Sequence, residues 1–309
     1  MQKQNQKKII FIVGPTAVGK SQVAAKLAEK INAEVISCDS MQVYQRMDII
    51  TSQPAGILRK KIRHHLLSVV SPLKEYNVSR YRRDALLKVK QIIHKGKIPL
   101  FTGGTGLYLS ILADGIFKMK PVAKSIRQGL YKEAEKHGSI YLHRQLKKID
   151  PQAALKIHPN DTRRIIRALE VFKATGKPIS ALQKQRSGLA DKYDLKIFCL
   201  NIARDKLNKR IEQRVEKMFQ QGLVKEVKKL LKSKLSKTAG YAIGLREVKG
   251  YLEGQYDLDT AKSMMARNTQ LYAKRQLTWF RKDKRIKWIE VEDKEKCSVI
   301  AERIFQRLK

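Results

Sequence analysis

The sequence predicts an α/β fold in which a parallel sheet forms the core and a helical lobe is inserted into it. Three observations support this fold. Short apolar runs rich in β-branched residues alternate with helical patterns, a glycine-rich loop joins the first run to the first helix, and one long stretch is helical without a strand. A chain of 309 residues is long enough to bury one large core and a smaller second lobe.

The apolar runs predict the strands of this sheet. The first run, Lys8–Val13, stops at Gly14, and the apolar residues Val23 and Leu27 then return at helical spacing. Units of strand, loop and helix build parallel sheets, because the crossover helix brings the chain back to the edge from which the first strand began. Further strands are expected at Glu34–Ser37, Lys97–Thr102, Leu195–Ile202 and Ile286–Val291.

The stretch from residue 118 to residue 192 is predicted to be the inserted helical lobe. Its exit is marked by residues 175–178, TGKP, where glycine can terminate a helix and proline cannot continue one. We therefore expect residues 1–117 and 193–309 to form the core, with a further helix pair at Lys206–Leu235. The helices expected in the lobe are Ile126–Lys136, Ile140–Ile149 and Asp161–Ala174, and the apolar stripe expected to be buried in the core comprises Leu207, Ile211, Val215 and Met218.

The composition indicates a polyanionic partner. Lys and Arg number 66 against 28 Asp and Glu, which gives a net charge of +38. Such an excess is typical of proteins that bind nucleic acid, although lysine-rich helix faces that are simply solvated are the alternative. No apolar run approaches the roughly 20 residues of a membrane span. The three cysteines lie far apart with no CxxC pair, so neither a disulfide framework nor a zinc site is expected, and a cytoplasmic location fits.

A phosphate-binding loop is predicted between the first strand and the first helix. Residues 14–21, GPTAVGKS, match the GxxxxGK(S/T) pattern in that context, so the core is expected to be P-loop NTPase-like. Lys20 can reach the phosphates and Ser21 can ligate Mg²⁺. The pattern leaves open whether the phosphates belong to ATP or to another diphosphate ester. The predicted phosphate-binding residues are Gly14, Pro15, Thr16, Ala17, Val18, Gly19, Lys20 and Ser21.

Two further polar segments follow predicted strands. Because the carboxyl ends of parallel strands meet at one edge of a sheet, we expect both segments to lie beside the phosphate loop. Asp39 follows the second strand and is a candidate for a general base, for a Mg²⁺ ligand through water, or for a helix cap. Residues 103–106, GGTG, end the third strand, where the glycines permit either a close backbone approach or an ordinary tight turn.

Taken together, these motifs resemble the tRNA dimethylallyltransferase family, bacterial type. The resemblance also rests on residues 160–170, NDTRRIIRALE, and residues 270–280, QLYAKRQLTWF, and it covers nearly the whole chain. It implies transfer of the dimethylallyl group from dimethylallyl diphosphate to N6 of the adenine 3′-adjacent to the anticodon, in tRNAs that read codons beginning with U. It also implies Mg²⁺ as the cofactor and the tRNA anticodon stem-loop as the partner, and we expect a monomer.

The resemblance further implies roles for individual residues. Asp39 corresponds to the general base of the family. Thr16, Lys20, Thr105 and Arg127 fall at positions that line the reaction channel or hold the diphosphate. On the residues alone, the arginines of the inserted lobe could equally form a solvated helix face. The residues implied to contact tRNA are Asp39, Ser40, Met41, Gln42, Thr105, Arg127, Arg163, Arg164, Ile165, Ile166 and Arg167.

Four residues depart from the family pattern, and two other functions remain open. Ile50 stands where the family has glycine, Gln53 replaces a lysine, Ser68 an aspartate and Leu245 a tyrosine. A small-molecule P-loop kinase would have a similar core, and a prenyltransferase acting on free adenine nucleotides would share the chemistry. The basic insertion and the 270–280 run disfavour both, because neither function needs a surface for RNA.

Overall fold

The computed structural model describes residues 6–54, 56–117, 119 and 122–309. A six-stranded sheet has the order β3-β2-β4-β1-β5-β6, and every pair of neighbouring strands is parallel. The predicted α/β class with a parallel sheet is therefore confirmed. The strands are β1 (Lys8–Val13), β2 (Ala33–Ser37), β3 (His64–His65), β4 (Ile98–Gly103), β5 (Asp194–Asn201) and β6 (Ile286–Glu290).

Strand β3 is the one strand that the sequence did not predict. It is two residues long, too short for an apolar pattern, and it pairs with β2 at the edge of the sheet. The imidazole Nε2 of His65 lies 2.7 Å from a carboxylate oxygen of Glu34 in β2, and the Lys97 amine donates to the same carboxylate at 3.2 Å. Both Glu34 and His65 are buried, so this group of polar side chains has a packing role.

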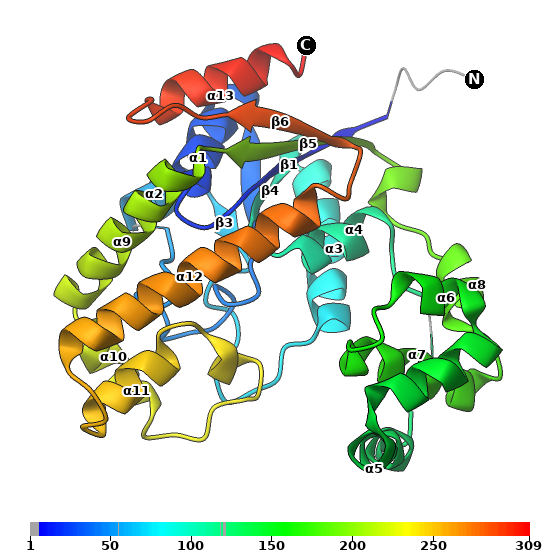
Figure 1. Cartoon of the computed structure of the whole chain (residues 1–309). Helices are drawn as coiled ribbons and strands as arrows, with labels where there is room; N and C mark the ends of the chain where they lie inside the picture. The colour runs from blue at the N-terminus through cyan, green and yellow to red at the C-terminus, as the bar shows by residue number, and fades with distance from the viewer. Residues whose placement is uncertain (1–5, 55, 118, 120–121) are drawn as a thin grey trace. The chain divides into compact units, whose positions relative to one another are not determined.

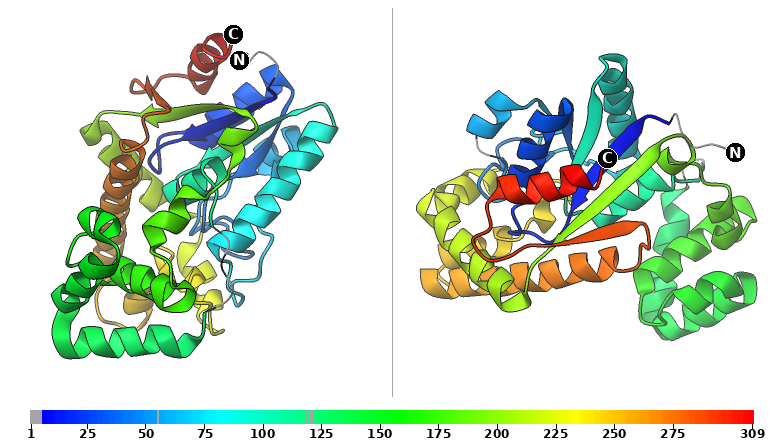
Figure 2. Two further views of the ribbon diagram at one scale, coloured as in Figure 1. Left: turned by 90° about the vertical axis from the view of Figure 1, so that its right-hand side faces the viewer. Right: turned by 90° about the horizontal axis from the view of Figure 1, so that it is seen from above.

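Helices cover the sheet, which is why β1 is buried from Ile9 to Val13. Helix α12 packs against α9, α11 and α4, and α13 packs against α1 (Figures 1 and 2). The predicted apolar stripe from Leu207 to Met218 lies on α9 and is buried. The helices of this unit are α1 (Lys20–Ile31), α2 (Gly56–Lys61), α3 (Val78–His94), α4 (Gly106–Ala113), α9 (Arg204–Gln220), α10 (Leu223–Leu230), α11 (Leu245–Leu252), α12 (Leu258–Phe280) and α13 (Cys297–Gln306), with a 3₁₀ turn at Ala239–Tyr241.

The chain folds into two compact units, residues 1–113 with 192–309 and residues 114–191. The second unit is helical, and Leu130, Leu146 and Ile165 belong to its own buried core. Two of its predicted helices are one element, interrupted at Gly138, whose φ of 81° and ψ of 165° are not helical. Its helices are α5 (Lys124–Ile149), α6 (Pro151–Lys156), α7 (Thr162–Thr175) and α8 (Ile179–Lys184), followed by a 3₁₀ turn at Leu189–Asp191.

Two local expectations concern helix ends and membrane spans. Gly176 follows α7 in the left-handed conformation, with φ 67°, and its N–H bonds to the carbonyl of Phe172, as expected for a glycine that terminates a helix. Within the ranges that the structure describes, no helix combines the length and the apolar composition that crossing a membrane requires.

Candidate active site

The phosphate loop lies between the end of β1 and the start of α1. Gly14 has φ 145°, and an added Cβ would lie 2.6 Å from the carbonyl oxygen of Leu200, so only glycine fits. Lys20 is the first residue of α1, and its Nζ donates to the carbonyl of Pro15 at 2.7 Å. The amine is thus held over the loop, where a phosphate would be surrounded by backbone N–H groups.

The charge of Lys20 is sensitive to its surroundings. Burial lowers the pKa of its amine to about 8, an effect that the Asp39 carboxylate opposes and the Arg214 guanidinium reinforces. A nearby anion would favour the protonated amine. The pocket around Lys20 is therefore suited to a ligand that brings negative charge of its own.

Asp39 follows β2 and lines the same pocket as Lys20. Its Oδ1 accepts hydrogen bonds from the backbone N–H groups of Met41 at 2.9 Å and Gln42 at 3.4 Å. No helix begins at this point of the chain, so these two bonds stabilise a turn. Asp39 therefore caps a turn and not a helix. No described residue donates to Oδ2, which leaves this oxygen available to accept a proton or to ligate a metal.

The GGTG turn packs directly on the segment that carries Asp39. Thr105 Oγ1 accepts from the N–H of Ser40 at 3.0 Å, and the Thr105 N–H donates to the carbonyl of Cys38 at 3.2 Å. A Cβ on Gly103 would lie 2.1 Å from that same carbonyl oxygen. Gly103 therefore permits the close backbone approach that the sequence offered as an alternative to an ordinary tight turn.

Gln276 links the phosphate loop to the GGTG turn, a role that the sequence did not indicate. Its Oε1 accepts from the N–H of Thr16 and its Nε2 donates to the carbonyl of Gly104, both at 2.9 Å. The side chain is buried. Tyr272, four residues earlier on the same face of α12, lines the same pocket. That spacing inside the 270–280 run was the available signal.

We expect Gln276→Ala to lower the free energy of unfolding by about 1–3 kcal/mol, because it leaves the partly buried N–H of Thr16 and the buried carbonyl of Gly104 without a partner. Urea unfolding followed by circular dichroism measures the change. Lys274→Ala, on an exposed face of the same helix, is the matched control. Equal unfolding free energies for the two variants would contradict the bridging role.

Two pockets adjoin at Asp39. The phosphate pocket has a volume of about 130 Å³. The second pocket, of about 400 Å³, has an apolar wall that includes Val215, Met218 and Met265. The arrangement can hold a charged group in one pocket and a hydrocarbon group in the other, with a carboxylate between them. The residues that line both pockets are Thr16, Asp39, Thr51, Arg214 and Tyr272.

Arg214 is a second residue whose place the sequence did not indicate. It lies on α9, and burial lowers its pKa while the Asp39 carboxylate raises it. Its guanidinium therefore adds positive charge where the two pockets meet. The available signal was a cation within the apolar stripe, three residues after Ile211 and four before Met218.

Comparisons with known proteins show the family to which the chain belongs. A family model described as IPP transferase matches residues 42–283. The chain is 46% identical over 303 residues to the tRNA dimethylallyltransferase of Carboxydothermus hydrogenoformans, which covers 96% of each chain. It is 45% identical over 298 residues to that of Natranaerobius thermophilus, covering 95% of this chain and 89% of the relative. This chain belongs to the IPP transferase family.

Solved structures of the family share the fold. The tRNA isopentenylpyrophosphate transferase of Bacillus halodurans superposes with a TM-score of 0.71 at 36% identity, covering 98% of this chain and 97% of that one. A eukaryotic dimethylallyltransferase acting on tRNA superposes with a TM-score of 0.79 at 31% identity, covering 97% of this chain and 77% of that one. The family and the P-loop NTPase-like fold that we predicted are confirmed.

The four residues that depart from the pattern of the IPP transferase family are accommodated in the structure. The Gln53 Nε2 donates to the Ser68 hydroxyl at 2.8 Å and to the carbonyl of Gln42 at 3.3 Å. Ile50 and Leu245 are buried, and Ile50 lines the second pocket. Gln53 and Ser68 are thus hydrogen-bonded to each other, and Ile50 and Leu245 are packed in the interior.

The candidate metal ligands are oxygen atoms. Ser21, in the first turn of α1, lines the phosphate pocket, as does Thr102, whose buried Oγ1 has no hydrogen-bond partner among the described residues. Across the described part of the chain there is no cluster of three or more His, Cys, Asp or Glu side chains suited to a metal. Mg²⁺ is usually held by one or two carboxylates together with substrate phosphates, so Ser21, Thr102 and Asp39 fit Mg²⁺ that arrives with a diphosphate.

The residues of the helical unit that were predicted to contact tRNA differ in their exposure and in their hydrogen-bond partners. Arg127 and Arg167 both donate to the buried carboxylate of Glu170, at 3.0 and 2.7 Å. Arg164 pairs with Asp161 at 3.4 Å. Ile165 and Ile166 are buried in the core of this unit, so their side chains are not available to RNA. Arg163 is exposed, and none of the described carboxylates forms an ion pair with it.

Proposed function

We propose that the chain transfers the dimethylallyl group from dimethylallyl diphosphate to N6 of the adenine 3′-adjacent to the anticodon, in tRNAs that read codons beginning with U. The observation that carries this proposal is the position of Asp39 where the phosphate pocket meets a pocket with an apolar wall. A diphosphate ester of a short hydrocarbon matches this pair of pockets. The names of the most similar relatives support the same reaction.

In this reaction the adenine N6 forms a bond to the allylic carbon while the bond from that carbon to the diphosphate oxygen breaks. The diphosphate leaves with the electron pair, and the proton of N6 passes to Oδ2 of Asp39. The Lys20 amine and the backbone N–H groups of residues 17–19 stabilise the negative charge that develops on the leaving diphosphate. Preorganised donors of this kind often make the largest single contribution to catalysis.

Ser21, together with Thr102, would hold Mg²⁺ against the diphosphate. When bound, Mg²⁺ would offset part of the charge of the leaving group. Thr16 contributes to the position of the loop, because its N–H donates to Gln276 and so ties the loop to α12.

The acceptor adenine must leave its stack to reach Asp39, which costs a few kcal/mol. Contacts with RNA can offset this cost. We assign these contacts to Ser40, Met41, Gln42 and Thr105 near the pocket, and to Arg127, Arg163 and Arg164 of the helical unit. We further propose that the protein acts as a monomer in the cytoplasm.

The test uses labelled dimethylallyl diphosphate with an anticodon stem-loop RNA that carries the target adenine, and in parallel with AMP and ADP. We expect label in the RNA and little in the nucleotides. Preferential labelling of AMP or ADP would replace the tRNA proposal with the nucleotide alternative. Transfer of the γ-phosphate of ATP to a small acceptor, with no prenyl transfer, would favour the kinase alternative.

Arg163, Arg164 and Arg167 stand in one basic segment of the sequence, but the structure gives them different surroundings. Arg163→Ala should flatten the log–log salt dependence of RNA binding by roughly 0.7–0.9 units, the loss expected for one phosphate contact. Arg167→Ala should instead lower the free energy of unfolding by about 1 kcal/mol, because it removes a cation from buried Glu170. Fluorescence anisotropy at several salt concentrations and urea unfolding measure the two effects. An unchanged salt slope for Arg163→Ala would mean that this side chain is only solvated.

A further inference from the structure

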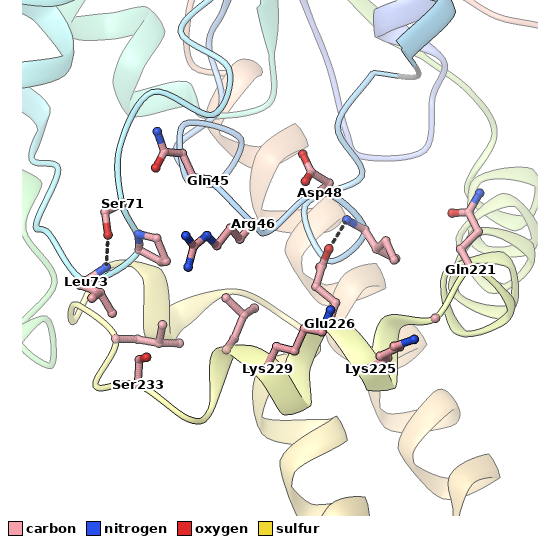
Figure 3. A pocket seen from close by; sticks show the side chains of 15 residues that line it. Gln45, Arg46, Asp48, Ser71, Leu73, Gln221, Lys225, Glu226, Lys229 and Ser233 are labelled. Atoms are coloured by element: carbon pink, nitrogen blue, oxygen red, sulfur yellow. Dashed lines mark hydrogen bonds between the residues drawn. The ribbon is translucent and has the colours of Figure 1, made fainter.

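A third cavity lies outside the two pockets of the active site. It has a volume of about 890 Å³ and opens between residues 45–49, residues 71–73, helix α10 and the segment that follows it. Figure 3 shows Arg46 on the loop side of this cavity and Lys225 and Lys229 on the side of α10. We call these three residues the cation cluster.

The positive charges of the cation cluster are not neutralised within the described part of the protein. None of the described residues forms a hydrogen bond or an ion pair with the side chains of Arg46, Lys225 or Lys229 that would neutralise them. Two carboxylates line the cavity. That of Glu226 is occupied, because its oxygens accept from the backbone N–H groups of Ile49 at 2.9 Å and Ile50 at 2.8 Å. Asp48 supplies the other, so the cavity presents an excess of positive charge.

The cavity and the active site are two sides of one loop. Ile49 lines the cavity, whereas the next residues, Ile50 and Thr51, line the second pocket beside Asp39. The Glu226 carboxylate fixes this loop by binding the N–H groups of Ile49 and Ile50. A long anionic ligand that reaches the active site therefore has the cation cluster close to it.

The kind of contact follows from the lining residues. None of the described residues lining the cavity is aromatic, so there is no ring on which a nucleobase could stack. Flexible cations bind phosphate groups irrespective of base sequence and release counterions when they do so. The cavity is thus suited to a phosphate backbone and unsuited to reading bases.

We propose that the cation cluster binds backbone phosphates of the same RNA whose adenine enters the active site. This inference rests on the proposed function, since it takes RNA as the acceptor. The cluster adds a contact surface on residues 45–49 and α10, separate from the arginines of residues 114–191.

The conformation of Arg46 provides a variant that removes charge without harm to the fold. Arg46 has φ 60°, the left-handed region that costs non-glycine residues roughly 1–2 kcal/mol. Arg46→Gly relieves this cost and deletes the guanidinium, so any loss of RNA binding is not explained by unfolding. Arg46→Lys restores the charge and serves as the rescue variant.

The experiment measures the Kd of an anticodon stem-loop RNA between about 50 and 200 mM salt, the range over which phosphate contacts change affinity strongly. The variants are Arg46→Gly, the pair Lys225→Ala with Lys229→Ala, and all three together. Lys228→Ala is the matched control, since Lys228 is an exposed lysine of α10 that does not line the cavity. Thermal unfolding checks that every variant is folded.

We expect each lost contact to flatten the log–log slope by roughly 0.7–0.9, so the rise in Kd across this range shrinks about threefold per contact. The triple variant should lose about two units or more of slope. Its KM for RNA should rise while kcat and the KM for dimethylallyl diphosphate stay unchanged. Lys228→Ala should keep the wild-type slope, and Arg46→Lys should regain it.

A triple variant with the wild-type slope would overturn the proposal and leave the cations as a solvated surface. A rise in the KM for the donor with an unchanged RNA slope would also overturn it, because the cavity would then belong to the donor site. If the unmodified protein binds RNA but transfers no prenyl group, only the proposed function fails. If it binds no RNA, both fail.

Discussion

Asp39→Asn should lower kcat by about 10²–10⁴-fold while the affinity for the donor is nearly unchanged. The physical reason lies in the two oxygens of Asp39. An asparagine can still accept the N–H groups of Met41 and Gln42 through its Oδ1, so the turn is kept. It cannot accept a proton at the position of Oδ2. Single-turnover rates at saturating RNA and donor measure the loss.

The other two roles considered for Asp39 give different results in the same experiment. A metal ligand predicts weaker diphosphate binding and partial rescue of the rate by high Mg²⁺, and that rescue would rule out the role of general base. A purely structural turn residue predicts a loss of stability of about 1 kcal/mol with activity mostly retained. Asp205→Asn makes the same substitution at an exposed position of α9 and should have no effect.

Lys20→Ala should lower kcat/KM for the donor by about 10²–10³-fold, the usual cost of removing one preorganised donor from a developing negative charge. Lys20 is positioned for this role because its Nζ is held over the phosphate loop by the carbonyl of Pro15. The measurement is the initial rate of prenyl transfer at low donor concentration. Lys26→Ala, on an exposed face of α1, is the control. A comparable rate for both variants would exclude Lys20 from the site.

The lowered pKa of Lys20 adds a pH dependence of known sign. The amine is protonated below its pKa of about 8 and loses its charge as the pH rises through that value. Since kcat/KM reports the ionisation of the free enzyme, kcat/KM for the donor should fall above about pH 8. Lys20→Arg should remove this fall, because a guanidinium stays protonated, even if its different shape lowers the rate overall. A fall of equal midpoint in Lys20→Arg would assign the titration to another group.

Much of the sheet was predictable because its signals are local. Strands β1, β2 and β4 and the second half of β5 are buried almost throughout, since a parallel sheet is covered on both faces, whereas β6 at the edge alternates between buried and exposed residues. Each of these runs is visible without reference to the rest of the chain. The phosphate loop is equally local, because its function needs glycines, Lys20 and Ser21 within eight consecutive residues. The expectation that Asp39 and the GGTG turn meet this loop followed from the topology of parallel strands.

Other features depend on neighbours that are distant in sequence. Strand β3 exists because two residues pair with β2 and because His65 meets Glu34, and two residues carry no periodic signal. Ile165 and Ile166 belonged to a segment implied to contact tRNA, yet packing within the helical unit buries both. Their apolar side chains are more stable away from water than at a charged interface.

The sequence by itself therefore determined the fold class, the phosphate loop and the family, because these depend on the order of residue types along the chain. Only the tertiary structure decided that Gln276 supports the loop, 260 residues away from Thr16, and that Arg214 lies where the two pockets meet. It likewise brought Arg46 opposite Lys225 and Lys229. Such contacts arise when helices pack against the sheet, and burial of apolar surface drives that packing without leaving a short-range pattern in the sequence.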